Sequence, residues 1–227
     1  MNRTSDAADR ALLATAAAAM LLQVVLVFGF APEAAGFRAP LTQRIFYYHV
    51  PIAWAAYVAF GVTALASLLV LRGGPAAARH DTLARAGAEV GTLFSLVALL
   101  TGLVWARQEF LDYDPFRDAK VISLVVLILA YLAYFALRAN VADRPRRRRL
   151  AAVFGLLALL GVPLSYLASR ASVHPDFTRT DEGLDPRLGV HLAFSLAAFT
   201  LLAAALVRLR ARLAALEEAL DDLEEST

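Results

Sequence analysis

Long apolar blocks dominate the chain and decide what it can fold into. Six stretches come close to the roughly 20 residues that an apolar helix needs to cross the core of a bilayer. We expect these spans at about 11–31, 47–71, 88–106, 121–138, 150–168 and 189–207. A soluble core would be built from amphipathic segments, whereas these blocks lack a polar face. The pattern therefore predicts an all-α fold, a polytopic membrane protein with six transmembrane helices.

Arginines in the connecting loops predict the orientation, because short loops rich in Lys and Arg stay in the cytoplasm. The loop after the fourth span carries six arginines against one acid, Asp143. Alternation then places both termini and the 72–87 loop in the cytoplasm, and the loops 32–46, 107–120 and 169–188 outside. The first block is expected to stay as a membrane helix, because its apolar run is long and APEAAGF lacks a small-residue cleavage pattern.

The chain divides into a six-helix membrane domain, 1–207, and a cytoplasmic tail, 208–227. Leucines in the tail follow a 4-3-4-3 spacing that predicts a short amphipathic helix continuing the last span: Leu209, Leu213, Leu216, Leu220 and Leu223. Two heptads are too few for an independent coiled coil. The tail is therefore either a passive extension or a segment that docks a partner.

Positive charge is confined to particular loops, and the net charge of the chain is only +2. The run RPRRRR is interpreted as a topology anchor that also contacts the headgroups of anionic membrane lipid. Nucleic-acid binding has no support from the total charge. We therefore expect no nucleic-acid partner.

The absence of cysteine excludes disulfides, thiolate metal sites and a cysteine nucleophile. His80 is expected to be solvated in a cytoplasmic loop, and His191 to satisfy a helix-terminal group. His49 and His174 are both expected on the outer face. Each alone would be an ordinary interfacial histidine. Together they are the two imidazoles that can ligate a porphyrin iron from both sides.

An aromatic outer loop, WARQEFLDYDPFRDAK at 105–120, lies between these two histidines in the chain. Phe110, Tyr113 and Phe116 recur at every third residue, which predicts rings on one side of a short helical or 3₁₀ segment. Three acids separate the rings: Asp112, Asp114 and Asp118. The loop is either an interfacial segment with rings in lipid and acids in water, or a platform for a large planar ligand.

The segment RIFYYHVPIAW resembles the start of the second span in the heme exporter protein C family of cytochrome c biogenesis. Five residues carry the match: Arg44, His49, Val50, Pro51 and Trp54. That family has a tryptophan-rich outer loop, the WWD domain, which ends in Trp-Asp-x-Arg and binds heme between two flanking histidines. Here Trp105 matches the leading Trp, and Asp118-Ala119-Lys120 fits the closing triplet with Lys for Arg. Phe and Tyr replace the other tryptophans, and they can still stack on a porphyrin.

The resemblance covers about residues 11–207 and implies a site for heme b on the extracytoplasmic face of the inner membrane. It implies that His49 and His174 are the axial ligands of the iron. Phe110, Tyr113 and Phe116 would form an aromatic platform supported by Trp105. Arg44 and Lys120 would be the cations that pair with the two propionates. Asp118 would orient the loop. The implied partners are a membrane-anchored heme chaperone and the subunits of an ABC transporter. The implied role is heme handling, and the chain is not expected to be an enzyme.

Three other functions are left open by the residues. A cytochrome c synthase of the related kind would carry further spans and extra histidines deep in the membrane. An electron-transferring cytochrome would need facing ligand pairs within the bundle, and His80 stands alone on the inner side. A heme-free structural or transport subunit would use the aromatic loop as an interface. Heme retention, and its loss on His substitution, separates the heme-binding functions from the last.

Overall fold

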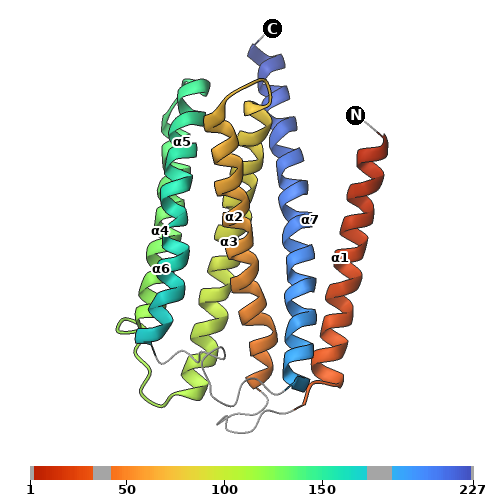
Figure 1. Ribbon diagram of the computed structural model, residues 1–227, viewed down its shortest axis with the longest axis vertical. Coiled ribbons are helices and arrows are strands. Elements are labelled where there is room, and N and C mark those ends of the chain that lie inside the picture. The colour runs from red at the N-terminus through yellow and green to blue at the C-terminus, as the bar shows by residue number, and fades with distance from the viewer. Residues whose placement is uncertain (1–2, 33–41, 173–185, 226–227) are drawn as a thin grey trace.

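The computed structural model describes residues 3–32, 42–172 and 186–225, and these residues form helices with no strand among them (Figure 1). The helices are α1 (Arg3–Gly29), η1 (Thr42–Ile45), α2 (Phe46–Arg72), α3 (Ala77–Glu109), α4 (Ala119–Asn140), α5 (Arg144–Leu159), α6 (Gly161–Ala168), η2 (Ser169–Ala171) and α7 (Pro186–Glu225). Within the described ranges, six helical segments are long and apolar enough to cross a membrane. The predicted all-α, six-span architecture is confirmed.

The bundle is organised around α2 and α3, which pack together along most of their length. On one side α4 and α5 pack against this pair and α6 packs against α4, and on the other side α7 packs against the pair. The first helix, α1, lies on the outer flank of α7 (Figure 1). Both chain ends lie at the top of Figure 1. We call this the terminal end, and the opposite end, which holds the 110–118 segment, the loop end.

Glycines allow α2 and α3 to approach closely. A Cβ atom at Gly87 would lie 2.7 Å from Thr63 Oγ1, and one at Gly91 would lie 2.5 Å from the ring of Phe60. The two glycines are one helical turn apart, so they lie on the same face of α3. Small residues at this spacing let membrane helices pack backbone to backbone. The core of the bundle is therefore built at this contact.

A proline in α2 is compensated by a side chain from α1. Pro51 has no N–H to donate to the Tyr47 carbonyl one turn earlier. Gln23, which is 0% exposed, donates from Nε2 to that carbonyl at 3.2 Å and lies 3.4 Å from Ser195 Oγ. Backbone groups in an apolar surrounding must find partners within the protein. Gln23 meets this need and joins α1, α2 and α7.

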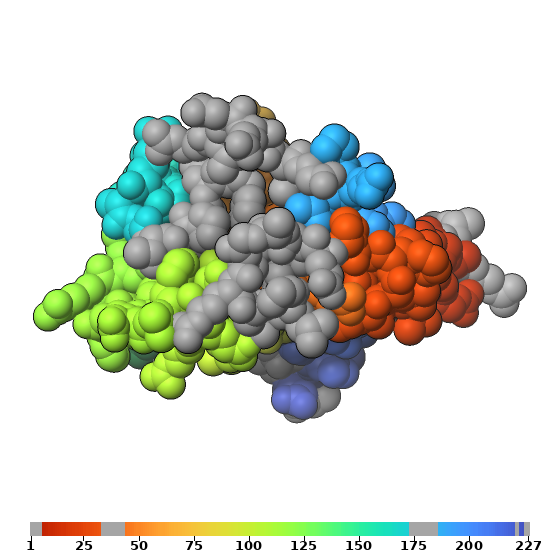
Figure 2. Space-filling model, turned by 90° about the horizontal axis from the view of Figure 1, so that it is seen from below, coloured from red at the N-terminus to blue at the C-terminus, as the bar shows by residue number. Residues whose placement is uncertain are grey.

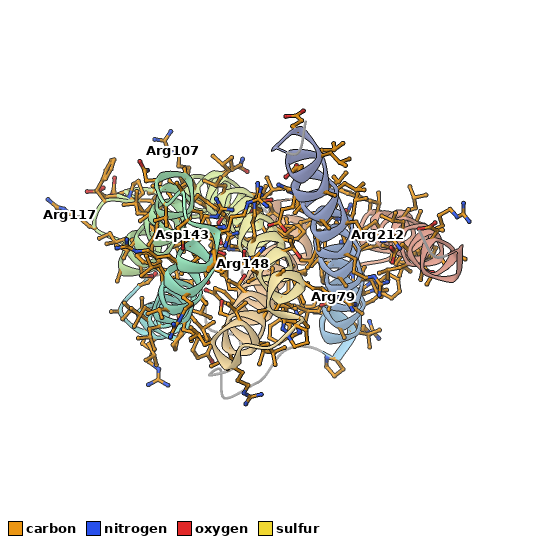
Figure 3. The ribbon with its side chains drawn as sticks, turned by 90° about the horizontal axis from the view of Figure 1, so that it is seen from above. Arg79, Arg107, Arg117, Asp143, Arg148 and Arg212 are labelled. Atoms are coloured by element: carbon orange, nitrogen blue, oxygen red, sulfur yellow. The ribbon has the colours of Figure 1, made fainter. Side chains whose placement is uncertain are left out.

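Ion pairs hold the terminal end together (Figure 3, which looks onto this end). Asp81, at the start of α3, accepts two hydrogen bonds from Arg138 of α4, at 2.7 and 2.8 Å. Glu89 of α3 pairs with Arg210 of α7. The helix α3 begins at Ala77, before the predicted start of the third span near residue 88, and Asp81 lies in this additional segment. The charges that shorten the apolar block in the sequence are neutralised by neighbouring helices.

The fifth and sixth spans also differ from the predicted bounds. Asp143 accepts a hydrogen bond from the Arg146 amide at 2.8 Å and caps α5, so this helix begins inside the arginine run. A break at Leu160 then separates α5 from α6. The last span and the tail form one unbroken helix, α7. The predicted helical extension of the last span is therefore present. The leucines of the 4-3-4-3 repeat lie exposed on this part of α7.

Candidate functional site

A cavity of about 60 Å³ lies at the loop end, between α2, α3 and the start of α4. Its walls are mainly apolar and include Ala53, Ala98 and Leu124. Six of the site residues that the sequence analysis predicted line it together: His49, Trp105, Phe110, Tyr113, Asp118 and Lys120. Residues from three helices, α2, α3 and α4, and from the loop between α3 and α4 therefore meet at one place.

His49 lies in the second turn of α2 and turns its ring toward α3. Its Nδ1 atom is 3.0 Å from Thr101 Oγ1. A Cβ atom at Gly102 would lie only 2.8 Å from His49 Cε1, so the ring packs directly over the backbone of α3. The cavity thus has an imidazole in its wall, with the ring held between α2 and α3.

The aromatic loop forms part of the cavity wall, although its backbone is not helical as predicted. Residues 110–118 form turns, because Asp114 Oδ1 accepts the Phe116 N–H at 3.0 Å and stabilises a turn around Pro115. The ring of Phe110 lies 5.5 Å from Trp105, edge to face, and 6.1 Å from Tyr113. Phe116 is 88% exposed and does not line the cavity.

Asp118 connects three segments around the cavity. Its carboxylate caps α4 by accepting the N–H groups of Lys120 and Val121, and it accepts the Ser172 hydroxyl at 2.9 Å. Figure 2 shows the aromatic loop, in light green, beside the end of α6, in cyan. The pKa of Tyr113 is raised to about 12, mainly by burial and also by the charge of Asp118 and a hydrogen bond to it. Asp118 therefore connects the aromatic loop to the start of α4 and to Ser172.

Lys120 places an ammonium group at the cavity wall. Its Nζ donates to the Ser165 carbonyl of α6 at 2.9 Å and lies 5.9 Å from the centre of the Tyr57 ring. The sequence analysis missed Tyr57 and Ser165. Tyr57 lies eight residues after His49, which is about two turns along the same face of α2. That spacing was the available signal for Tyr57, and Ser165 had none.

Arg44 lies beside a neighbouring hollow of about 230 Å³, which shares Trp105 with the cavity. Its Nη1 donates to the Phe28 carbonyl at 3.2 Å, and its guanidinium lies 5.7 Å from the centre of the Phe28 ring. Arg44 therefore ties the end of α1 to the start of α2. The structure does not bring it into the cavity with Lys120.

Two other histidines, His80 and His191, lie away from the cavity. His174 lies outside the described residues. His191 is in α7, with its ring 6.1 Å from that of Tyr47, and His80 is in the first turn of α3 at the terminal end. Among the residues that the structure describes, no group of three or more His, Cys, Asp or Glu side chains could hold a bare metal ion.

The sequence matches the family model for heme exporter protein C over residues 2–225. The chain belongs to the heme exporter protein C family. It is 34% identical to heme exporter protein C of Bradyrhizobium diazoefficiens over 152 residues, which cover 66% of this chain and 56% of that protein. It is 30% identical to the protein of the same name from Escherichia coli K12 over 188 residues, 82% of this chain and 74% of that one. For Rhodobacter capsulatus the identity is 30% over 214 residues, 87% and 83% of the two chains.

Membership of the heme exporter protein C family confirms the resemblance found in the sequence and extends it. The matched region includes almost all of the tail, which the sequence comparison had left outside. The match to the Bradyrhizobium protein spans just over half of that protein's length.

The side chains of the cavity suit heme. An imidazole can ligate iron, aromatic rings can pack on a porphyrin face, and an ammonium can pair with a propionate.

Proposed function

We propose that this chain binds heme at its loop end and presents it to a membrane-anchored heme chaperone during cytochrome c maturation. The observation that carries the proposal is the convergence of His49, the Trp105–Phe110–Tyr113 rings and Lys120 on one cavity. Each group matches one part of heme: iron, macrocycle and propionate. Membership of the heme exporter protein C family supports the same cargo.

In this proposal, His49 and His174 are the axial ligands of heme b. Coordination by two neutral imidazoles needs no covalent bond to the protein, so the cargo can leave. The sequence contains no cysteine, and this chain therefore offers no thiol for a thioether link. Covalent attachment of heme takes place on a partner, and this chain has a handling role and no enzymatic one.

The aromatic loop would hold the macrocycle. Phe110 and Tyr113 line the cavity with Trp105, and these rings are the inner part of the platform. Phe116 is exposed at the rim, where it would contact the outer part of heme or the partner that collects it. Lys120 pairs with a propionate, and Arg44, in the adjoining hollow, is placed for the second.

The proposed orientation has the loop end outside the cytoplasm of an inner-membrane protein. The arginines of the α4–α5 connection lie at the terminal end together with both chain ends. Under the positive-inside rule, that end faces the cytoplasm. The cavity then opens toward the compartment in which a membrane-anchored chaperone would receive heme, and ABC transporter subunits would drive its later release.

A transfer assay tests this proposal. The purified chain, loaded with hemin, is mixed in liposomes with a membrane-anchored heme chaperone, and heme on the chaperone is detected by heme staining after denaturing electrophoresis. We expect transfer from the wild type and from His80→Ala, whose histidine lies at the terminal end, and none from His49→Ala. Equal transfer from His49→Ala and wild type would overturn the proposal, as would hemin that never associates with the wild type.

A further inference from the structure

The hydroxyl of Thr101 lies between the ring of His49 and the backbone of α3. Thr101 Oγ1 is 3.0 Å from His49 Nδ1. It is also 2.8 Å from the carbonyl oxygen of Val97 and 3.1 Å from that of Ala98. These two carbonyls belong to the preceding turn of α3, and threonine in a helix commonly donates to them. The Thr101 hydroxyl can therefore donate to a carbonyl of α3 and accept from the ring of His49.

The distances around the Thr101 hydroxyl favour one direction for the bond to His49. A threonine hydroxyl has one proton to donate and two lone pairs. The shortest contact of Thr101 Oγ1 is to the Val97 carbonyl, at 2.8 Å against 3.0 Å to His49 Nδ1, and a carbonyl oxygen only accepts, so we assign the proton of Thr101 to that carbonyl. Toward His49 the hydroxyl oxygen can then only accept, which requires a proton on Nδ1. In the neutral imidazole the other nitrogen, Nε2, then carries the lone pair.

Gly102 provides the space that this contact needs. A Cβ atom at this position would lie 2.8 Å from His49 Cε1 and 3.4 Å from Nδ1. Any side chain at residue 102 would therefore push the ring away from α3 and away from the Thr101 hydroxyl. Gly102 itself lines the cavity, together with His49.

We propose that Thr101 and Gly102 are positioning residues for His49. Thr101 fixes the ring in its Nδ1–H form, so that Nε2 presents its lone pair, and Gly102 gives the ring room to stay there. The inference rests on the proposed function for what Nε2 binds, namely the heme iron. The form of the ring itself is a property of the chain without any ligand.

Two consequences follow for bound heme. A hydrogen bond from the second ring nitrogen makes imidazole a more basic ligand, and loss of such a partner commonly lowers metal affinity about 10- to 100-fold. A more basic ligand favours ferric over ferrous iron. Loss of the Thr101 hydroxyl is therefore expected to weaken hemin binding by about that factor and to raise the midpoint potential of the heme.

The first test needs no heme. The chain is labelled with ¹⁵N-histidine, and His49→Ala identifies the ring signals of His49 in ¹H–¹⁵N spectra at a pH where the ring is neutral. We expect the Nδ1–H form in the wild type and in Thr101→Ser, and a mixture of forms in Thr101→Val. Thr92→Val is the matched control, because Thr92 makes the same bond to Ala88 on α3. A wild-type ring in the Nε2–H form would overturn the inference.

The second test measures hemin affinity and midpoint potential in the same variants. Thr101→Val should bind about 10- to 100-fold more weakly at a higher potential, and Thr101→Ser should restore both values. Gly102→Ala should lose binding, while Gly61→Ala, where a Cβ would meet nothing within 4 Å, should keep it. If His49→Ala abolishes binding but Thr101→Val leaves affinity and potential unchanged, the positioning role is wrong and the proposed function stands. If His49→Ala has no effect, the proposed function is wrong.

Discussion

The side-chain amide of Gln23 donates to the Tyr47 carbonyl, the group that Pro51 leaves without its helical partner. The bond joins α1 to α2 only two residues before His49. In an apolar surrounding, an unsatisfied carbonyl at this point would weaken the first turns of α2. A polar residue inside the first span thus supports the helix that carries the proposed heme ligand.

A double-mutant cycle tests this compensation. Gln23→Leu should lower the free energy of unfolding by about 1 kcal/mol, as is usual for a lost hydrogen bond. In a Pro51→Ala background, the restored N–H at residue 51 can bond the carbonyl, so Gln23→Leu should cost less. Thermal unfolding in detergent gives both values. An equal cost in the two backgrounds would show that Gln23 does not serve this carbonyl.

The buried ion pair of the terminal end should be far more important than an exposed one. Asp81 is 1% exposed and has two bonds to Arg138, so Asp81→Ala leaves a buried guanidinium without its main partner. The expected loss is about 3–5 kcal/mol. Arg117 pairs with Asp114 at 3.4 Å while 89% exposed, so Arg117→Ala should leave stability unchanged. Chemical unfolding of both variants checks the contrast, and similar losses would contradict it.

The number and order of the spans could be predicted from hydropathy, because each block is long enough for a bilayer. Their ends could not be predicted in the same way. Asp81 looks like a loop residue in the sequence, and only the folded bundle brings Arg138 to it. The prediction of a short helical segment in the aromatic loop was wrong, because a spacing of three residues between rings cannot show that Asp114 and Pro115 make a turn.

The candidate site was predictable where a residue type has one obvious use. His49, the aromatic rings and Lys120 have chemistry that points to heme once the family resemblance is seen. Thr101 and Gly102 have no such chemistry, because threonine and glycine are common in membrane helices. Their roles depend on how α2 packs on α3, and that packing is visible only in three dimensions. His174 stays a prediction from the sequence.

Titration of Tyr113 tests the arrangement around Asp118. The pKa of Tyr113 in the folded chain is about 12, against an ordinary value of 10.0. Between pH 10 and pH 12 the folded state therefore keeps the phenol proton, whereas the unfolded state loses it. The contribution of this group to the free energy of unfolding is fully present below pH 10 and is lost as the pH rises through 12. The wild-type minus Tyr113→Phe ultraviolet difference spectrum follows this group.

The variant Asp118→Asn should lower the pKa of Tyr113 only in part. It removes the carboxylate charge and replaces a charged acceptor of the Tyr113 hydroxyl with a neutral amide oxygen, whereas burial, the largest cause, persists. Asp114→Asn, which changes another acid of the same loop, is the control and should leave the pKa of Tyr113 near its wild-type value. A Tyr113 midpoint that is the same in Asp118→Asn and wild type would show that the two side chains do not interact.

Substitutions in the aromatic loop should separate its inner and outer rings. Phe110→Ala removes a ring from the cavity wall and should weaken hemin binding by about tenfold, the equivalent of roughly 1.4 kcal/mol. Phe116→Ala removes an exposed ring and should weaken binding less. Hemin titration followed by absorbance measures both. The opposite order would mean that the loop adopts another arrangement when heme is bound.

The absorption spectrum of the purified protein, oxidised and reduced, tests the central claim most directly. The protein is co-expressed with a heme chaperone and compared with His49→Ala and His174→Ala, and with His80→Ala and His191→Ala as controls. We predict six-coordinate heme in the wild type and in both controls, and its loss in the first two variants. An unchanged spectrum in His49→Ala and His174→Ala, with heme lost in His191→Ala, would contradict the account.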